Sequence, residues 1–199
     1  MALLGTDLIS FERNGRGSPE EQALTAGQVG LWLFLATVTM LFAGFTSAIL
    51  VRRTAPDWQP IPIPELLWLN TGLLVSSSFT MERVRRLARQ QQWNAMRSWL
   101  VTTALLGLLF LTGQVAAWRQ LVARGLYLSS NPHSSFFYIL TGTHGVHLLG
   151  GLFALGYLLA RYLPGSLEPA RRTGLNLFAT YWHFLDALWI YLFVVLFVV

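Results

Sequence analysis

Long runs without charge, separated by short charged stretches, constrain this sequence more than any other feature. A helix that crosses the hydrocarbon core of a bilayer needs about 17 to 25 mostly apolar residues. The expected spans are residues 27–51, 65–81, 98–118, 136–160 and 175–199. Inside a bilayer, a helix satisfies all of its backbone hydrogen bonds within its own segment. We therefore predict an all-α, polytopic membrane bundle of about five transmembrane helices.

Only 12% of the 199 residues are charged, whereas soluble domains average about 25%. Residues 1–26 mix acidic, basic and turn-forming residues without a compact apolar run, which argues against a signal peptide. We expect them to form a cytoplasmic N-terminal segment. Residues 27–199 show no internal repeat and no water-soluble region, so they are predicted to form one transmembrane domain.

The span at residues 65–81 is the shortest and the most polar, with Asn70, Thr71 and three consecutive serines. Such a helix is expected to pack among other helices, where small residues permit close approach and hydroxyls find partners. The preceding stretch, residues 52–64, holds four prolines and is predicted to be an extended external loop. The arginine-rich stretch that follows, residues 82–97, is predicted to be a helical extension at the membrane interface.

All 14 basic residues are arginines, and they lie between the apolar runs rather than on a water-facing domain. This distribution argues against nucleic-acid binding. Ten arginines fall on one predicted side of the membrane and four on the other, and the arginine-rich side is retained in the cytoplasm. The ten are Arg13, Arg16, Arg83, Arg85, Arg86, Arg89, Arg97, Arg161, Arg171 and Arg172. We predict a cytoplasmic N-terminus and a periplasmic C-terminus, in a bacterial inner membrane.

Four ionisable side chains fall inside the predicted spans, where insertion costs roughly 3 kcal/mol for a charged group. They are His144 and His147 in one span, and His183 and Asp186 in the last one. The members of each pair are three residues apart and share a helix face. His133 precedes its span and is expected to be a solvated loop residue. The absence of cysteine excludes disulfides, iron–sulfur clusters and thiolate copper sites within this chain.

Three hypotheses account for these buried groups. Facing helices can hold a haem through histidines. Chains of Asp and His can also carry protons. Alternatively, His144, His147, His183 and Asp186 form a hydrogen-bonded network that fixes the packing of the last two spans, with His183 and Asp186 bonded along their helix. We favour the last hypothesis, because polar groups commonly join helices in membranes.

Two motifs resemble the paired signatures of subunit III of haem–copper oxidases. The first is His144-Gly145-Val146-His147 followed by Gly150. The second is Tyr181-Trp182-His183-Phe184-Leu185-Asp186 followed by Trp189. They occur in the family's order on the last two spans, and the resemblance covers about residues 27–199. The length matches the five-helix bacterial type.

The resemblance implies an all-helical subunit with no catalytic, cofactor-binding or metal-binding residue of its own. Haem and copper are then expected in the partners, the catalytic subunit I and the copper-bearing subunit II. It also implies bound phospholipid, support of stability and proton uptake, and a structural role for the motif residues. By alignment, a buried glutamate common in the family is replaced by Val38, and an acidic residue of the third span by Ala117.

The sequence therefore predicts an accessory subunit III of an aerobic respiratory oxidase that passes electrons to oxygen while translocating protons. Membership of a respiratory supercomplex is left open. The alternative is a membrane b-type cytochrome or quinone-site subunit that uses His147 and His183 as haem ligands. A small transporter would need broken helices at mid-membrane, and only the short span 65–81 hints at one.

Overall fold

The computed structural model describes residues 19–62, 64–162 and 169–198, which form five long helices and no strand. The helices are α2 (Pro19–Arg52), α3 (Leu66–Arg89), α4 (Trp93–Ala123), α5 (Pro132–Tyr162) and α6 (Pro169–Val198). The predicted all-α class is confirmed. Most of the predicted N-terminal segment lies outside the described residues, and its last part, from Pro19, belongs to α2. Part of the predicted connection 161–174 also lies outside them.

Four helices are long and apolar enough to cross a membrane, over Ala26–Arg52, Trp93–Ala123, Pro132–Ala160 and Gly174–Phe197. The remaining helix, α3, has 24 residues, which at 1.5 Å per residue makes it about 36 Å long. Its length suffices for a hydrocarbon core of about 30 Å, but its serines, threonines and asparagine and the charged residues from Glu82 onward make it less apolar than the other four helices. Several of its polar side chains are instead turned toward neighbouring helices, as the sequence predicts, with Asn70, Ser77 and Thr80 buried.

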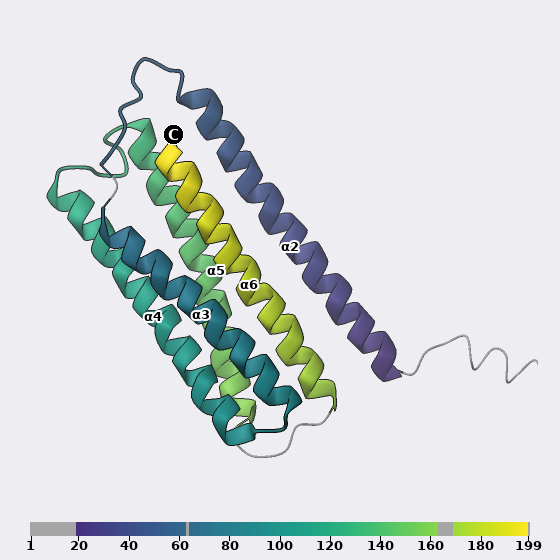
Figure 1. Ribbon diagram of the computed structural model, residues 1–199. Helices are drawn as coiled ribbons and strands as arrows, with labels where there is room; N and C mark the ends of the chain where they lie inside the picture. The colour runs from purple at the N-terminus through teal and green to yellow at the C-terminus, as the bar shows by residue number, and fades with distance from the viewer. Residues whose placement is uncertain (1–18, 63, 163–168, 199) are drawn as a thin grey trace, which may run out of the picture.

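The helices α3, α4, α5 and α6 pack around a shared core, and α2 lies against α5 and α6 at one side (Figure 1). The face of α2 that meets the bundle is a stripe at helical spacing. It consists of Leu35, Val38, Phe42 and Ile49, each buried. The start of α2, the α3–α4 turn and the start of α6 lie at one end of the molecule (Figure 1). The end of α6 and the loop after α2 lie at the other.

The arginine-rich stretch at residues 82–97 is helical on both sides of a tight turn. The first half completes α3, and α4 begins at Trp93. Gln91 adopts a left-handed φ of 59°, and the amide of Gln92 donates to the carbonyl of Leu87 at 3.1 Å. This is the six-to-one hydrogen bond that terminates many helices, although glycine is the usual residue at the left-handed position.

The proline-rich loop after α2, at residues 53–62, folds back onto the start of α5. Trp58 stacks on His133 with ring centroids 4.9 Å apart, and the Ile61 amide donates to His133 Nδ1 at 3.0 Å. His133 is buried, with only 3% of its surface exposed. The prediction that His133 is a solvated loop residue was wrong. His133 belongs to the first turn of α5, and the loop after α2 covers it. The loop is accordingly closed over α5, and Ile61 is buried.

Candidate functional site

Three side chains of α6 form hydrogen bonds with hydroxyl groups of α3. The pairs are Trp182 Nε1 with Ser77 Oγ at 3.1 Å, His183 Nδ1 with Ser78 Oγ at 2.6 Å, and Trp189 Nε1 with Thr71 Oγ1 at 3.0 Å. Residue numbers rise along α6 as they fall along α3, so the two helices are antiparallel. The polar motif of the last span is therefore bonded to the polar second span, which supplies the hydroxyls.

The Trp182 ring of α6 packs against Gly107 of α4 and Gly151 of α5. It is fully buried, and a methyl group added at Gly107 would lie 3.1 Å from its ring. A methyl group at Gly151 would lie 3.4 Å from the same ring. In contrast, no atom lies within 4 Å of a methyl group built at Gly150. The motif glycine at position 150 thus faces no neighbouring helix closely, whereas a methyl group at Gly151 would lie at van der Waals distance from α6.

His144 is fully buried between aromatic rings of two other helices. Its ring centroid lies 5.9 Å from that of Phe110 on α4 and 5.1 Å from that of Trp189 on α6. Neither ring nitrogen of His144 has a hydrogen-bond partner among the described residues. Gln114, one turn along α4 from Phe110, is also buried with its amide unbonded there. His144 thus packs as an aromatic side chain at this position.

His147 faces α2 rather than the interior. Its Nδ1 donates to the Thr143 carbonyl one turn earlier at 2.8 Å, and its ring lies near Phe34 and Phe42. The hydroxyl of Tyr181 donates to the His147 backbone carbonyl at 2.8 Å and joins α6 to α5. The contribution of position 147 to the α5–α6 contact is therefore made by its backbone.

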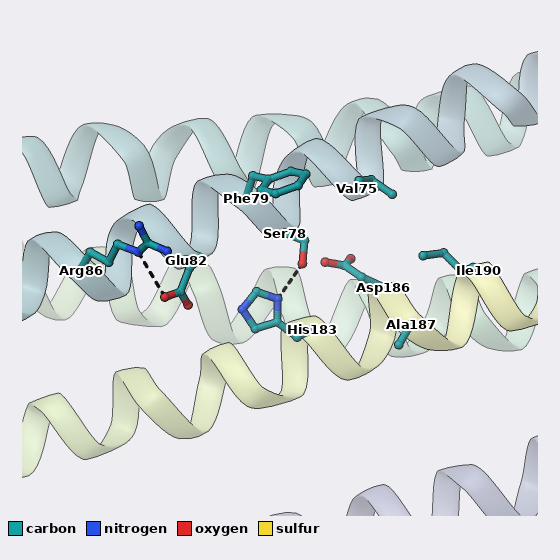
Figure 2. A pocket seen from close by; sticks show the side chains of 9 residues that line it. All are labelled: Val75, Ser78, Phe79, Glu82, Arg86, His183, Asp186, Ala187 and Ile190. Atoms are coloured by element: carbon teal, nitrogen blue, oxygen red, sulfur yellow. Dashed lines mark hydrogen bonds and ion pairs between the residues drawn. The ribbon is translucent and has the colours of Figure 1, made fainter.

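A groove of about 410 Å³ lies between α3 and α6 on the outer surface of the bundle (Figure 2). Its polar part consists of Ser78, His183 and Asp186, which point toward one another in Figure 2. Its apolar part is formed by Val75, Phe79, Ala187 and Ile190, and one end by Glu82 and Arg86. The groove therefore brings together a hydroxyl, an imidazole and a carboxylate from two helices that are far apart in sequence.

Asp186 is the least satisfied polar group of the groove. The residue is only 4% exposed, and neither carboxylate oxygen has a hydrogen-bond partner in the described part of the chain. The expected hydrogen bond between His183 and Asp186 along α6 is not formed, because the His183 ring turns to Ser78 on α3. The carboxylate is left facing the groove (Figure 2).

The carboxylate at the end of the groove is already paired. Glu82 accepts from Arg85 Nη1 at 3.1 Å and from Arg86 Nε at 3.4 Å, both along the same helix. These side chains are partly exposed, so each pair contributes little to stability, about 0.5 kcal/mol. Their consequence is electrostatic, since the negative charge of Glu82 is balanced locally, whereas no basic side chain of the described residues forms an ion pair with Asp186.

The geometry does not favour the alternative in which His147 and His183 hold one haem. A haem held by two histidines needs both rings to face each other across the iron. Here the His147 ring contacts α2, whereas the His183 ring contacts α3. Within the described residues, no group of three or more His, Cys, Asp or Glu side chains is arranged to hold a metal ion. Val38 and Ala117, the positions aligned from the sequence with acidic residues of the family, are both buried.

Sequence reasoning did not identify the individual partners on α3. Thr71, Ser77 and Ser78 were noted for their polarity, and the tertiary structure pairs each with one residue of the α6 motif. The spacing carried a partial signal, because Trp182 and Trp189 are seven residues apart and share a face of α6, whereas their partners Ser77 and Thr71 are six residues apart on α3.

Comparisons with known proteins agree with the motifs. The family model for cytochrome c oxidase subunit III matches residues 3–199. A probable cytochrome c oxidase subunit 3 from Nocardia farcinica is 36% identical over 176 residues, which cover 86% of this chain and 87% of the relative. The corresponding protein of Mycobacterium tuberculosis is 35% identical, covering 85% of this chain and 86% of the relative. Cytochrome c oxidase subunit 3 of Synechocystis sp. is 34% identical, covering 98% of this chain and 84% of the relative.

Proposed function

This chain belongs to the cytochrome c oxidase subunit III family, and from that membership we propose that it is the cofactor-free accessory subunit III of an aerobic haem–copper oxidase. In the assembled enzyme it would pack beside the catalytic subunit I and the copper-bearing subunit II. Electron transfer to oxygen and the coupled proton translocation would then take place on those partners, which would hold the haem and copper.

The observation that carries this proposal is that polar side chains of the family motif on α6 are bonded to a neighbouring helix. The side chains of Trp182, His183 and Trp189 each form a hydrogen bond with a hydroxyl group of α3. A side chain bonded in this way fixes two helices relative to each other, and in membranes such a bond is worth about 0.6 kcal/mol on average. The motif thus supports helix packing rather than ligation of a prosthetic group.

Bound phospholipid fits the outer surface of the bundle. Large apolar side chains such as Met40, Val51 and Phe153 are more than 70% exposed in the isolated chain. Arginines gather at the α3–α4 end, where they would lie near anionic headgroups. We propose that lipid covers much of this surface in a bacterial inner membrane, with the arginine-rich end in the cytoplasm.

We further propose that the subunit sustains the stability of the oxidase and its proton uptake without the family's usual carboxylates. Val38 stands in a buried stripe of α2 that packs on the bundle, and Ala117 is buried on α4. Neither side chain can bind a proton. Any contribution of this chain to proton uptake would therefore be indirect. It would act through the shape and hydration of the path by which protons enter the catalytic subunit.

Purification of the tagged full-length chain from its native membrane in mild detergent tests the proposal. A haem–copper catalytic subunit should co-purify in a fixed ratio. His183→Ala should lower the amount of assembled complex, because the bond to Ser78 is lost, and should leave the haem per catalytic subunit nearly unchanged. Phe153→Ala, at an exposed position on α5, serves as the control. Purification without any oxidase subunit, or a haem carried by this chain alone, would refute the proposal.

A further inference from the structure

Asp186 lies at the middle of its membrane span. It is twelve residues after Gly174 and eleven before Phe197, the two ends of the apolar stretch. At 1.5 Å per residue, the carboxylate is about 17 Å from either end along the helix. The hydrocarbon core is about 30 Å thick, so this depth is beyond the reach of lipid headgroups.

A carboxylate at this depth needs a hydrogen-bond donor. Neither oxygen of Asp186 has a donor at hydrogen-bond distance among the described residues, and only 4% of the residue is exposed. The Ser78 hydroxyl beside the carboxylate is bonded to His183 Nδ1 at 2.6 Å. Burying a polar group without a partner is unfavourable, and an unpaired charge is more so. Acyl chains carry no donor, so lipid tails filling the groove would leave the carboxylate unsatisfied. The occupant must bring its own donor to mid-membrane.

The groove opens on the outer surface of the bundle, at the depth of the apolar stretch of α6. Phe79 at its edge is 73% exposed and Ile190 is 44% exposed. The charge of Glu82 at one end is balanced by Arg85 and Arg86, which leaves Asp186 as the acceptor without a counterpart. An apolar edge around a single acceptor complements an apolar helix that carries one donor.

We propose that the α3–α6 groove is the docking site for a transmembrane helix of a neighbouring oxidase subunit, which places a hydrogen-bond-donating side chain against Asp186. The inference rests on the proposed function and adds to it the face through which this chain meets its partner. The apolar part of that helix packs on Val75, Phe79 and Ile190, and its donor completes the polar group formed by Ser78, His183 and Asp186 (Figure 2).

Photo-cross-linking in the intact membrane tests the docking face without disturbing Asp186. A photoreactive phenylalanine analogue replaces Phe79 at the groove or, as the matched control, Phe153 on α5, which is 79% exposed. The expected result is a strong cross-link from position 79 to another oxidase subunit and a several-fold weaker one from position 153. Cross-links from position 79 only to lipid or to a second copy of this chain would overturn the inference. Equal cross-linking from both positions would overturn it as well.

Two substitutions at Asp186 test the donor. Asp186→Leu removes the acceptor, and retention of this chain by the purified oxidase should fall about three- to tenfold, the loss expected for one interhelical hydrogen bond in a membrane. Asp186→Asn keeps an acceptor oxygen of the same reach and should retain most of the binding. Equal retention of the leucine variant and the wild-type chain would refute the assignment.

The two proposals fail in different ways. If no oxidase subunit co-purifies with the wild-type chain, the proposed function fails. If the oxidase co-purifies but position 79 does not contact it, only the docking site fails. Circular dichroism of each purified variant confirms that its helices are intact before retention is compared, and the cross-linking arm keeps Asp186 unchanged.

Discussion

Gly113 of α4 lies directly against Asn70 of α3, and replacing it with alanine is the sharpest test of how these helices pack. A methyl group at position 113 would overlap the Asn70 amide oxygen and lie 2.8 Å from its Cγ. Asn70 is 1% exposed and donates a long hydrogen bond to the Phe110 carbonyl at 3.5 Å. The side chain cannot move outward into solvent, so Gly113→Ala must displace the amide or separate the two helices.

The matched control is Gly150→Ala, because no atom lies within 4 Å of a methyl group built there. Alanine favours the helix over glycine by about 1 kcal/mol at either position, so this contribution cancels between the variants. Overpacking costs about 1–3 kcal/mol, and loss of the Asn70 hydrogen bond adds about 0.6 kcal/mol. Gly113→Ala should therefore be about 1.5–3.5 kcal/mol less stable than Gly150→Ala.

The free energy of unfolding can be measured on the full-length chain in mixed micelles, by titration with sodium dodecyl sulfate and circular dichroism. The reasoning is refuted if Gly113→Ala is as stable as Gly150→Ala. The double variant Asn70→Ala/Gly113→Ala provides a further check, since removing the amide makes room for the methyl group. Its loss should be smaller than the sum of the two single losses, because residues in contact are coupled.

Further predictions concern other contacts and the chain as a whole. A double-mutant cycle of Trp189→Phe and Thr71→Val should give a coupling energy of about 0.6 kcal/mol, and additive losses would contradict the bond at 3.0 Å. His133→Ala should speed hydrogen exchange of the Ile61 amide by removing its acceptor, and unchanged protection would argue against the closed loop. Gln91→Gly should raise stability by about 1 kcal/mol by relieving the left-handed φ of 59°, and an unchanged unfolding midpoint would contradict this. The purified chain alone should show no stoichiometric haem in its absorption spectrum.

The motif residues were predictable from the sequence, but their partners were not. Trp182 and Trp189 share one face because they are seven residues apart, and the sequence places His183 and Asp186 at mid-span. Hydrogen bonding along α6 was the expected use of His183, whereas the structure bonds it to Ser78, 105 residues earlier. Local spacing defines which residues share a face, but the choice between a neighbour on the same helix and one on another depends on helix rotation.

Burial near the helix ends could not be predicted for a similar reason. His133 stands before the apolar part of its span, and charge and hydropathy give no sign that the loop after α2 covers it. Trp58 reaches it only because α2 and α5 pack side by side and bring residues 75 positions apart into a ring stack. Likewise, Gly150 and Gly151 are equivalent in the sequence, and only the position of α6 makes the second one the contact with Trp182.

The sequence by itself determined that this protein is built for a lipid bilayer, that its fold is all-α, and which family it belongs to. Uncharged runs of membrane length require helices because a bilayer leaves no other way to satisfy the backbone, and two motifs in order identify the family. Only the tertiary structure decided which polar side chains are satisfied within the chain and which are not. Interhelical hydrogen bonds depend on the rotation and depth of each helix, and these are set by packing among all of the helices. That packing leaves Asp186 facing the α3–α6 groove.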